Sequence, residues 1–359
     1  MKEFINYMAD PIRSFPIFTA LFFLMIKYVR VFGSKKFGKW SLILSIPVVA
    51  WFCADPNFLA IVLWPDNIPI VILIATVSFF TWFALHKAVE NDKRTEAGDV
   101  PIEALPENRE KVWCWPNLVY TELFAIIAGT CFLVIWAIVF KAPLEEPANP
   151  TWAPNPAKAP WYFLGLQEML VYFDPWMAGV VLPGLIIVGL VAIPYIDTNP
   201  KGNGYFSFED RKFAMTMFLF GWLVLWIYLI IVGTFLRGPN WTFYGPFEFW
   251  DHHKVVAEYN VNLSEFMWIH WLKMAMPANM FVREILGILM SIGYITALPY
   301  WIGQKTKWGR DFIAKIGYMR FYLMLSLALI MGSLPIKMVL RWLFSLKYIV
   351  ALPELELNL

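Results

Sequence analysis

Charged and metal-binding side chains are scarce in this chain of 359 residues. Only 16% of the residues are charged, and there are four histidines and three cysteines. Cys53, Cys114 and Cys131 show no Cys-x-x-Cys or Cys-x-x-Cys-His spacing, so the sequence indicates neither a zinc site nor a covalently attached haem. A nucleotide-binding loop, a Ser-His-Asp arrangement and a metal-ligand cluster are also not evident. The net charge of +2 does not indicate a nucleic-acid partner.

Hydrophobic residues make up 59% of the chain and aromatic residues 18%, well above the averages of soluble proteins. Crossing a bilayer takes about 20 apolar residues. We therefore predict an all-α, polytopic integral membrane helical bundle with about eight transmembrane helices. The predicted spans are residues 15–32, 41–64, 67–86, 118–140, 176–196, 213–236, 280–302 and 318–340. The first, second and last contain charges or prolines, so re-entrant or interfacial segments are an alternative there.

Basic residues gather in the connections on one side of this eight-span topology. They are Lys35, Lys36 and Lys39; Lys87, Lys93, Arg94, Arg109 and Lys111; Lys201, Arg211 and Lys212; and Lys305, Lys307, Arg310 and Lys315. Short basic loops stay cytoplasmic, so residues 141–175 fall on the extracytoplasmic side, with Glu145, Glu146 and Asp174 near the loop. The charged N-terminus lacks a clear cleavage site, so we expect the first span to be retained.

Four histidines limit what the chain can bind. A haem held between two helices needs histidines that face a shared site, and only His86 lies in a predicted span. His252, His253 and His270 all follow the sixth span. We therefore expect no complete haem ligand pair within this chain. His86 is either an interfacial residue or a contact to a quinone or a neighbouring haem.

Four short motifs surround the fourth and fifth predicted spans. They are Trp115-Pro116-Asn117-Leu118, Glu146-Pro147-Ala148-Asn149-Pro150, Pro160-Trp161-Tyr162-Phe163 and Ile193-Pro194-Tyr195. In this order they resemble the C-terminal part of cytochrome b, and the chain is similar to subunit IV of the split cytochrome complex of photosynthetic membranes. The resemblance covers about residues 112–240 and extends through the span that ends near Ile302. It divides the chain into an N-terminal extension (1–111), a cytochrome b C-terminal domain (112–302) and a C-terminal extension (303–359).

The resemblance implies a membrane subunit of a quinol:cytochrome c oxidoreductase of the cytochrome bc type in a bacterial inner membrane. This chain would wall the quinol-oxidation site. Haem b and a Rieske iron-sulfur cluster would lie on partner subunits, namely a haem-bearing cytochrome b N-terminal-type chain and a Rieske protein. A c-type cytochrome, lipid, a dimeric assembly and menaquinone as the quinone are further expectations.

The family's loop carries a Pro-Glu-Trp-Tyr signature, whose Glu is thought to accept a proton from the quinol. The matching residues here are Ala159-Pro160-Trp161-Tyr162, so Pro160 replaces that Glu. The resemblance implies a quinone site formed by Pro160, Trp161, Tyr162 and Phe163, together with Glu168. The replacement of the signature Glu by Pro160 leaves open which group accepts the proton of the quinol.

Glu168 is the nearest carboxylate after the motif. In a short helix over 165–171 it would lie seven residues, or two turns, from Trp161 and could point into the same pocket. Two interpretations stand: a proton relay with a raised pKa, or a structural ion pair, for example to Lys158. Tyr162 is likewise either a catalytic residue or an interfacial anchor.

Residues 237–279 are rich in aromatic residues and too polar to span a membrane. They form either an aromatic belt at the interface or a docking surface for a haem c or Rieske-type partner. A quinone-binding membrane anchor of another respiratory oxidoreductase is the main alternative function. A transporter is the second, although no internal repeats are obvious.

Overall fold

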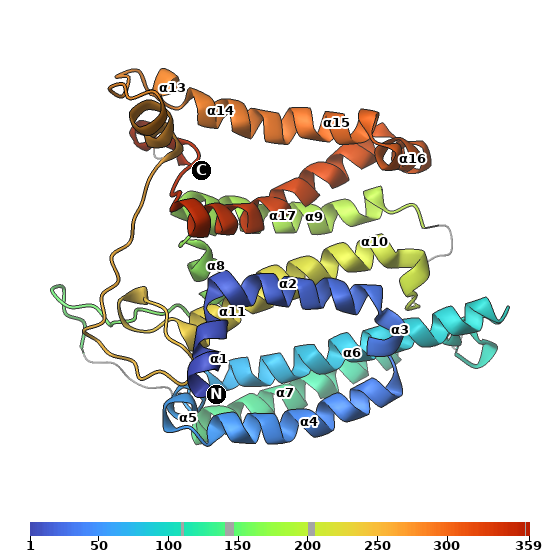
Figure 1. The fold of residues 1–359 in the computed structure, drawn as a ribbon. Helices are drawn as coiled ribbons and strands as arrows, with labels where there is room; N and C mark the ends of the chain where they lie inside the picture. The colour runs from blue at the N-terminus through green and yellow to red at the C-terminus, as the bar shows by residue number, and fades with distance from the viewer. Residues whose placement is uncertain (109–110, 141–146, 200–204, 356) are drawn as a thin grey trace.

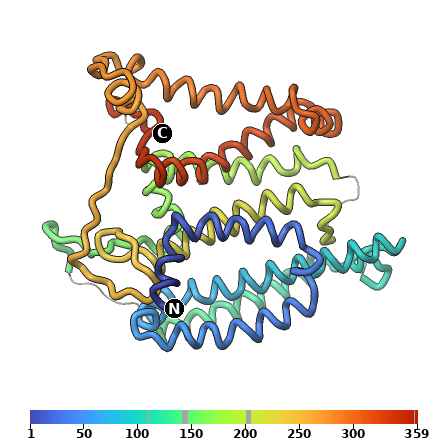
Figure 2. Tube along the Cα trace, viewed as in Figure 1, coloured from blue at the N-terminus to red at the C-terminus, as the bar shows by residue number. Residues whose placement is uncertain are grey.

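The computed structural model describes residues 1–108, 111–140, 147–199, 205–355 and 357–359. Its long helices run side by side in one bundle, and short helices and loops close the two ends (Figures 1 and 2). The α-helices are α1 (Lys2–Ala9), α2 (Pro11–Lys27), α3 (Val29–Phe32), α4 (Lys35–Cys53), α5 (Pro56–Val62), α6 (Ile68–Glu96), α7 (Val119–Val139), α8 (Leu164–Met169), α9 (Leu182–Ile196), α10 (Phe208–Leu219), α11 (Tyr228–Ile231), α12 (Leu263–Glu265), α13 (Met280–Arg283), α14 (Ile285–Ile292), α15 (Leu298–Lys305), α16 (Lys307–Ile316) and α17 (Tyr318–Phe344).

Short helical segments of other geometry extend or connect these helices. The 3-10 turns are η1 (Ile102–Ala104), η2 (Pro106–Asn108), η4 (Trp161–Phe163), η8 (Pro239–Trp241) and η11 (Pro353–Leu355). The π-helical segments are η3 (Cys114–Leu118), η5 (Met177–Val181), η6 (Phe220–Ile227), η7 (Val232–Leu236), η9 (Phe266–Trp271) and η10 (Gly293–Ala297). Two short antiparallel strands, β1 (Ala351–Leu352) and β2 (Leu357–Asn358), pair near the C-terminus.

Seven helical runs within the described residues are long and apolar enough to cross a membrane. They are Lys35–Cys53, Ile68–Glu96, Cys114–Val139, Met177–Ile196, Phe208–Leu236, Ile285–Lys305 and Tyr318–Phe344. Helices α1 and α2 meet at 82° and make an eighth candidate if counted together. The predicted all-α multi-pass bundle is therefore confirmed.

The helix of the second predicted span is shorter than expected because it ends at Cys53 and a new helix begins at Pro56. The Asp55 carboxylate accepts hydrogen bonds from the backbone N–H groups of Asn57 (2.9 Å) and Phe58 (3.3 Å), and so caps α5. It also pairs with Lys2, whose Nζ lies 2.6 Å from Oδ2. Helix α4 consequently ends at Cys53, and α5 forms a separate short helix at the same end of the bundle as α1 (Figure 1).

The basic clusters predicted from the sequence lie in connections at one end of the bundle. Figure 1 shows α3, α16, the end of α6 and the start of α10 there, and α1, α5, α8 and α13 at the other. We call these the basic end and the opposite end. The four predicted basic clusters belong to connections at the basic end, as the eight-span topology requires. Arg109 and Lys201 of these clusters, and the acidic Glu145 and Glu146, lie outside the described residues.

The C-terminal part of α6 projects beyond the neighbouring helices at the basic end (Figure 1). Its side chains contact the start of α10 there. The buried Asp92 carboxylate accepts hydrogen bonds from the Ser207 hydroxyl (2.7 Å) and from the backbone N–H groups of Phe208 and Glu209 (both 3.2 Å). A carboxylate on these free N–H groups stabilises the first turn of α10. Asp92 of α6 therefore fixes the start of α10, the helix that leads into the sixth predicted span.

A two-point ion pair joins α9 to α10 at this end. The Asp197 oxygens lie 2.6 and 2.7 Å from the guanidinium nitrogens of Arg211. The hydrogen bond from Arg211 holds the pKa of Asp197 below its usual 3.8. Its stabilising contribution is complete above pH 3.8 and disappears as the pH falls through the lower pKa of the folded state.

We expect Asp197→Asn to lower the free energy of unfolding by about 1 kcal/mol at pH 7, since the pair is partly exposed. The deficit should shrink at pH values below 3.8, where the wild type also loses its charge. Thermal unfolding of the detergent-solubilised protein across a pH series measures this. A deficit that stays constant down to the most acidic pH would contradict the ion-pair explanation.

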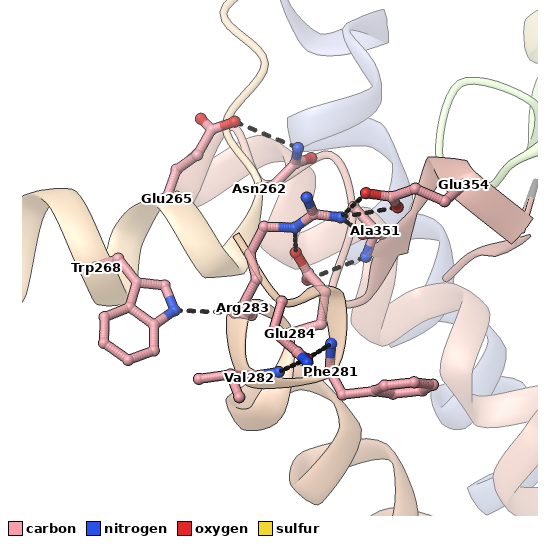
Figure 3. A network of polar contacts seen from close by, with 10 residues as sticks. Asn262, Glu265, Trp268, Phe281, Val282, Arg283, Glu284, Ala351 and Glu354 are labelled. Atoms are coloured by element: carbon pink, nitrogen blue, oxygen red, sulfur yellow. Dashed lines mark hydrogen bonds and ion pairs between the residues drawn. The ribbon is translucent and has the colours of Figure 1, made fainter. Parts of the chain in front are cut away.

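The segment after α17 packs against α13 and α14, and Figure 3 shows the polar network that joins them. The Arg283 guanidinium lies between two carboxylates, 3.2 Å from Glu284 Oε1 and 2.9 Å from Glu354 Oε2. Glu284 is buried and accepts a hydrogen bond from the Ala351 N–H at 3.1 Å. The Trp268 indole N–H donates to the Arg283 carbonyl at 2.9 Å. This network fixes the tail to the bundle.

Gly287 permits the closest approach between this tail and α14. A Cβ at Gly287 would overlap sterically with the Ile349 carbonyl oxygen, which lies 1.9 Å from its position. Because that oxygen belongs to the backbone, the chain would have to shift. We expect Gly287→Ala to lower the free energy of unfolding by about 1–3 kcal/mol through this overlap. Gly293 is the matched control in the same span, because a Cβ there meets nothing within 4 Å. Equal stability of the two alanine variants would refute the tail packing.

Candidate functional site

An ion pair between a completely buried carboxylate and a mostly buried arginine lies at the opposite end of the bundle. Glu168 in α8 has 0% of its surface exposed. Arg237, just after η7, donates from Nη2 to Glu168 Oε1 at 2.8 Å and from Nε to both carboxylate oxygens at 3.2 and 3.1 Å. Its Nη1 donates to the Trp241 carbonyl at 3.2 Å. Arginine suits this position because its planar fork matches a carboxylate.

Opposing influences act on the Glu168 carboxyl. Burial raises its pKa, since the charged form loses its hydration, and the nearby guanidinium of Arg237 and ammonium of Lys158 work against that rise. The pair therefore combines a protonatable group with a permanent cation. Such coupled buried groups occur both in structural networks and at functional sites.

Lys158 adds a second cation to the same region. Its Nζ donates to the Thr234 carbonyl at 2.7 Å and lies 4.7 Å from the centre of a Trp250 ring. The partly buried side chain thus points inward from its loop. Burial lowers the pKa of Lys158 to about 7, with Glu168 raising it and Arg237 lowering it further. The ion-pair partner of Glu168 is Arg237, and Lys158 acts on it only at longer range.

The loop that carries Lys158 is held at two points. Gln167 accepts a hydrogen bond from the Ala159 N–H at 2.8 Å and donates to the Ala157 carbonyl at 2.8 Å. Asn155 donates to the Asn240 side-chain oxygen at 2.8 Å and accepts from its backbone N–H at 2.6 Å. The loop is therefore tied to α8 on one side and to η8 on the other.

The aromatic motif after this loop forms the 3-10 turn η4, which leads directly into α8. Trp161 is partly buried and packs against the main core, whereas 48% of Tyr162 and 50% of Phe163 are exposed. Pro160 lies exposed just before the turn. The motif thus presents Tyr162 and Phe163 outward while Glu168, one to two turns further on, points inward.

Two tyrosines near the Glu168–Arg237 pair contact aromatic residues from distant parts of the chain. Tyr172 and Tyr228 are buried, and both interact electrostatically with Glu168. Phe15 of α2 contacts Tyr228 with ring centres 5.4 Å apart, and Trp342 of α17 contacts Tyr172 at 6.0 Å. Phe15 and Trp342 also touch each other at 5.7 Å. Helices α2 and α17 therefore pack on the two tyrosines.

Comparison with known protein families identifies the segment that contains Glu168 and Arg237. Residues 147–248, less than a third of the chain, match the family described as cytochrome b(C-terminal)/b6/petD. The chain carries a cytochrome b C-terminal-type segment. No solved structure matches the chain. The family match supports a membrane subunit of a cytochrome b-containing quinol oxidoreductase and a partner subunit of the cytochrome b N-terminal type.

The cytochrome b-type segment contributes Lys158, η4, Glu168 and Arg237, whereas Phe15 and Trp342 lie outside it. The match covers 147–248, so it begins later than the expected range 112–240, ends slightly beyond it, and does not include the expected extension to Ile302. The motif Trp115-Pro116-Asn117-Leu118 precedes the matched residues. The Glu146 residue of the second motif lies outside the described residues.

The four histidines lie in three separate parts of the fold. His86 Nδ1 lies 2.7 Å from the Gly33 carbonyl, and its ring stacks on Trp82 with centres 5.4 Å apart. His252 and His253 are exposed in a loop, and His270 lies on η9. Among the described residues no group of three or more His, Cys, Asp or Glu side chains could hold a metal ion. His86 is thus a contact between α3 and α6.

Sequence reasoning selected Glu168 and the motif but missed Arg237 as the carboxylate's partner. Sixty-nine positions separate the two residues, and no local pattern links them. The available signal was an arginine immediately after an apolar run, where a buried counter-charge is needed. The proposed roles of Pro160, Trp161, Tyr162, Phe163 and Glu168 in quinone chemistry stay predictions.

Proposed function

We propose that this chain is a membrane subunit of a quinol:cytochrome c oxidoreductase of the cytochrome bc type and forms part of its quinol-oxidation site. One observation carries the proposal: the cytochrome b-type segment joins the aromatic turn η4 directly to the buried Glu168–Arg237 pair. An apolar surface next to a protonatable group is what oxidation of a quinol requires. The basic end would face the cytoplasm, and the site would face the extracytoplasmic side of a bacterial inner membrane.

Each motif residue has a proposed task. Pro160, Trp161 and Phe163 shape the wall on which the quinone ring lies, and the exposed Tyr162 hydroxyl hydrogen-bonds the quinol oxygen. Oxidation of a quinol releases two protons and two electrons. We assign Glu168 as an acceptor for a proton, since Pro160 has no side chain that could take one. The electrons leave to one-electron acceptors on partner subunits.

The proposed partners supply what the chain lacks. A haem-bearing cytochrome b N-terminal-type subunit and a Rieske iron-sulfur protein would receive one electron each, and a c-type cytochrome would accept electrons from the Rieske protein. Menaquinone as the quinone, bound lipid and a dimeric assembly complete the proposal. The family match supports a partner subunit of the cytochrome b N-terminal type.

The test is purification of the complex under mild conditions, followed by subunit analysis, haem spectra and quinol-dependent cytochrome c reduction. We expect a b-type haem and an iron-sulfur subunit to copurify, together with reduction that depends on added menaquinol. Copurification with a different dehydrogenase would instead identify a quinone-binding membrane anchor. Substrate flux across vesicles without haem partners would identify a transporter.

A further inference from the structure

The buried cluster holds two cations but one carboxylate. Arg237 bonds both oxygens of Glu168, so the carboxylate is committed to the guanidinium. No carboxylate of the described residues forms an ion pair with Lys158, whose hydrogen bond goes to the Thr234 carbonyl. Arginine stays protonated in proteins, whereas lysine can release its proton when buried. Lys158 is therefore the cation in the cluster that can lose its charge.

Loss of that proton leaves a balanced cluster, with one guanidinium facing one carboxylate. Burial penalises the surplus charge, and this explains why the pKa of Lys158 falls to about 7. The two residues that contact the ammonium also offer polar atoms. The Thr234 hydroxyl and the Trp250 indole N–H are buried without a partner in the described part of the chain. The surroundings of Lys158 are therefore polar as well as enclosed.

Glu168 has no direct route to water, because its side chain is completely buried. Among the titratable groups that act on the pair, Tyr172 is buried and its pKa is raised well above the neutral range. The Tyr228 hydroxyl is engaged with Ser14 Oγ at 2.8 Å. Glu258 is 62% exposed and paired with Arg341. Lys158 is partly buried in a surface loop, and unlike the partly exposed Arg237 it can release its proton.

From this arrangement we infer that Lys158 is the group through which the Glu168–Arg237 site exchanges protons with the aqueous side. The amine of Lys158 takes a proton from the site, becomes an ammonium and then releases the proton to water, so that one proton is gained and lost per cycle. This inference rests on the proposed function, since it assigns the exit route of a quinol proton. It makes Lys158 a proton carrier rather than a structural cation.

The deciding variant is Lys158→Arg, which keeps the positive charge and the hydrogen-bond donors but cannot release its proton. We expect turnover of quinol-dependent cytochrome c reduction to fall about 100-fold at pH 7, in the range for a lost acid-base group. We also expect wild-type activity to rise with pH around pH 7, and this rise to be absent in Lys158→Arg. Lys254→Arg is the matched control, because Lys254 lies at the same end, contacts the Tyr244 ring at 4.2 Å and has its own carboxylate in Glu248 at 2.6 Å.

A second measurement uses the unmodified protein and does not depend on turnover. Acetylation of lysines by acetic anhydride, read peptide by peptide by mass spectrometry over a pH series, reports the neutral fraction of Lys158. A midpoint near pH 7 supports the inference, and a midpoint above about pH 9 overturns it.

The two proposals can fail separately. Near-normal turnover and an unchanged pH profile in Lys158→Arg, in a complex with intact haems, would overturn the assignment of Lys158 alone. A wild-type complex that assembles with its haems but oxidises no quinol would overturn the proposed function, and this inference with it.

Discussion

Replacing Glu168 with glutamine is expected to lower quinol-dependent cytochrome c reduction by about 100-fold at pH 7, while haem content stays normal. The size follows from removing one proton acceptor from a reaction that must release protons. Glutamine keeps the shape of glutamate, and its carbonyl oxygen can still accept hydrogen bonds from Arg237. The loss should therefore appear in turnover rather than in assembly, which haem spectra of the purified complex would check.

Glu258→Gln is the matched control for this experiment. Glu258 also pairs with an arginine, Arg341, at 3.1 Å, but it is 62% exposed. We expect its replacement to leave turnover unchanged. Full activity of Glu168→Gln across pH 6–9 would remove Glu168 from the proton chemistry and leave the Glu168–Arg237 pair with a structural task only.

Replacing Arg237 with leucine is expected to lower the free energy of unfolding by about 3–5 kcal/mol, because a buried carboxylate then has no guanidinium partner. The remaining Glu168 would escape part of this cost by binding a proton. Its pKa in the folded state then lies above the unfolded value, so the destabilisation should be smallest at acidic pH and grow as the pH rises. Denaturant titration of the solubilised protein at several pH values measures both effects.

Two further variants test the explanation. The double replacement Glu168→Leu with Arg237→Leu removes both charges and should recover most of the lost stability. Arg341→Leu leaves behind the exposed Glu258, which water can hydrate, and we expect it to cost less than about 1 kcal/mol. A double variant as unstable as Arg237→Leu would show that packing, rather than the unpaired charge, dominates.

The membrane architecture could be predicted from sequence because hydropathy and loop charge are local properties. The segment 67–86 was expected as a span, and α6 begins one residue later, at Ile68, and continues to Glu96. The continuation is stabilised by tertiary contacts, such as Asp92 with Ser207, which a hydropathy pattern does not contain. Element ends of this kind depend on partners that lie far away along the chain.

The candidate site was predictable only in part for the same reason. The short helix that holds Glu168 was expected over 165–171 and is observed at Leu164–Met169. Trp161 precedes it in a 3-10 turn, so the spacing of one continuous α-helix does not apply between the two residues. Phe15 and Trp342, which pack on Tyr228 and Tyr172, lie outside the matched segment, and no sequence motif indicates a role for them.

The double hydrogen bond of Gln167 has a thermodynamic consequence for any molecule that binds beside the loop. By bonding the carbonyl of Ala157 and the N–H of Ala159, the Gln167 amide fixes the backbone there before a ligand arrives. Ordering a flexible residue costs about 1–2 kcal/mol, and a binding site that is already ordered does not lose that amount from its affinity. Amide hydrogen exchange of this loop should therefore be as slow in the free protein as with quinone bound.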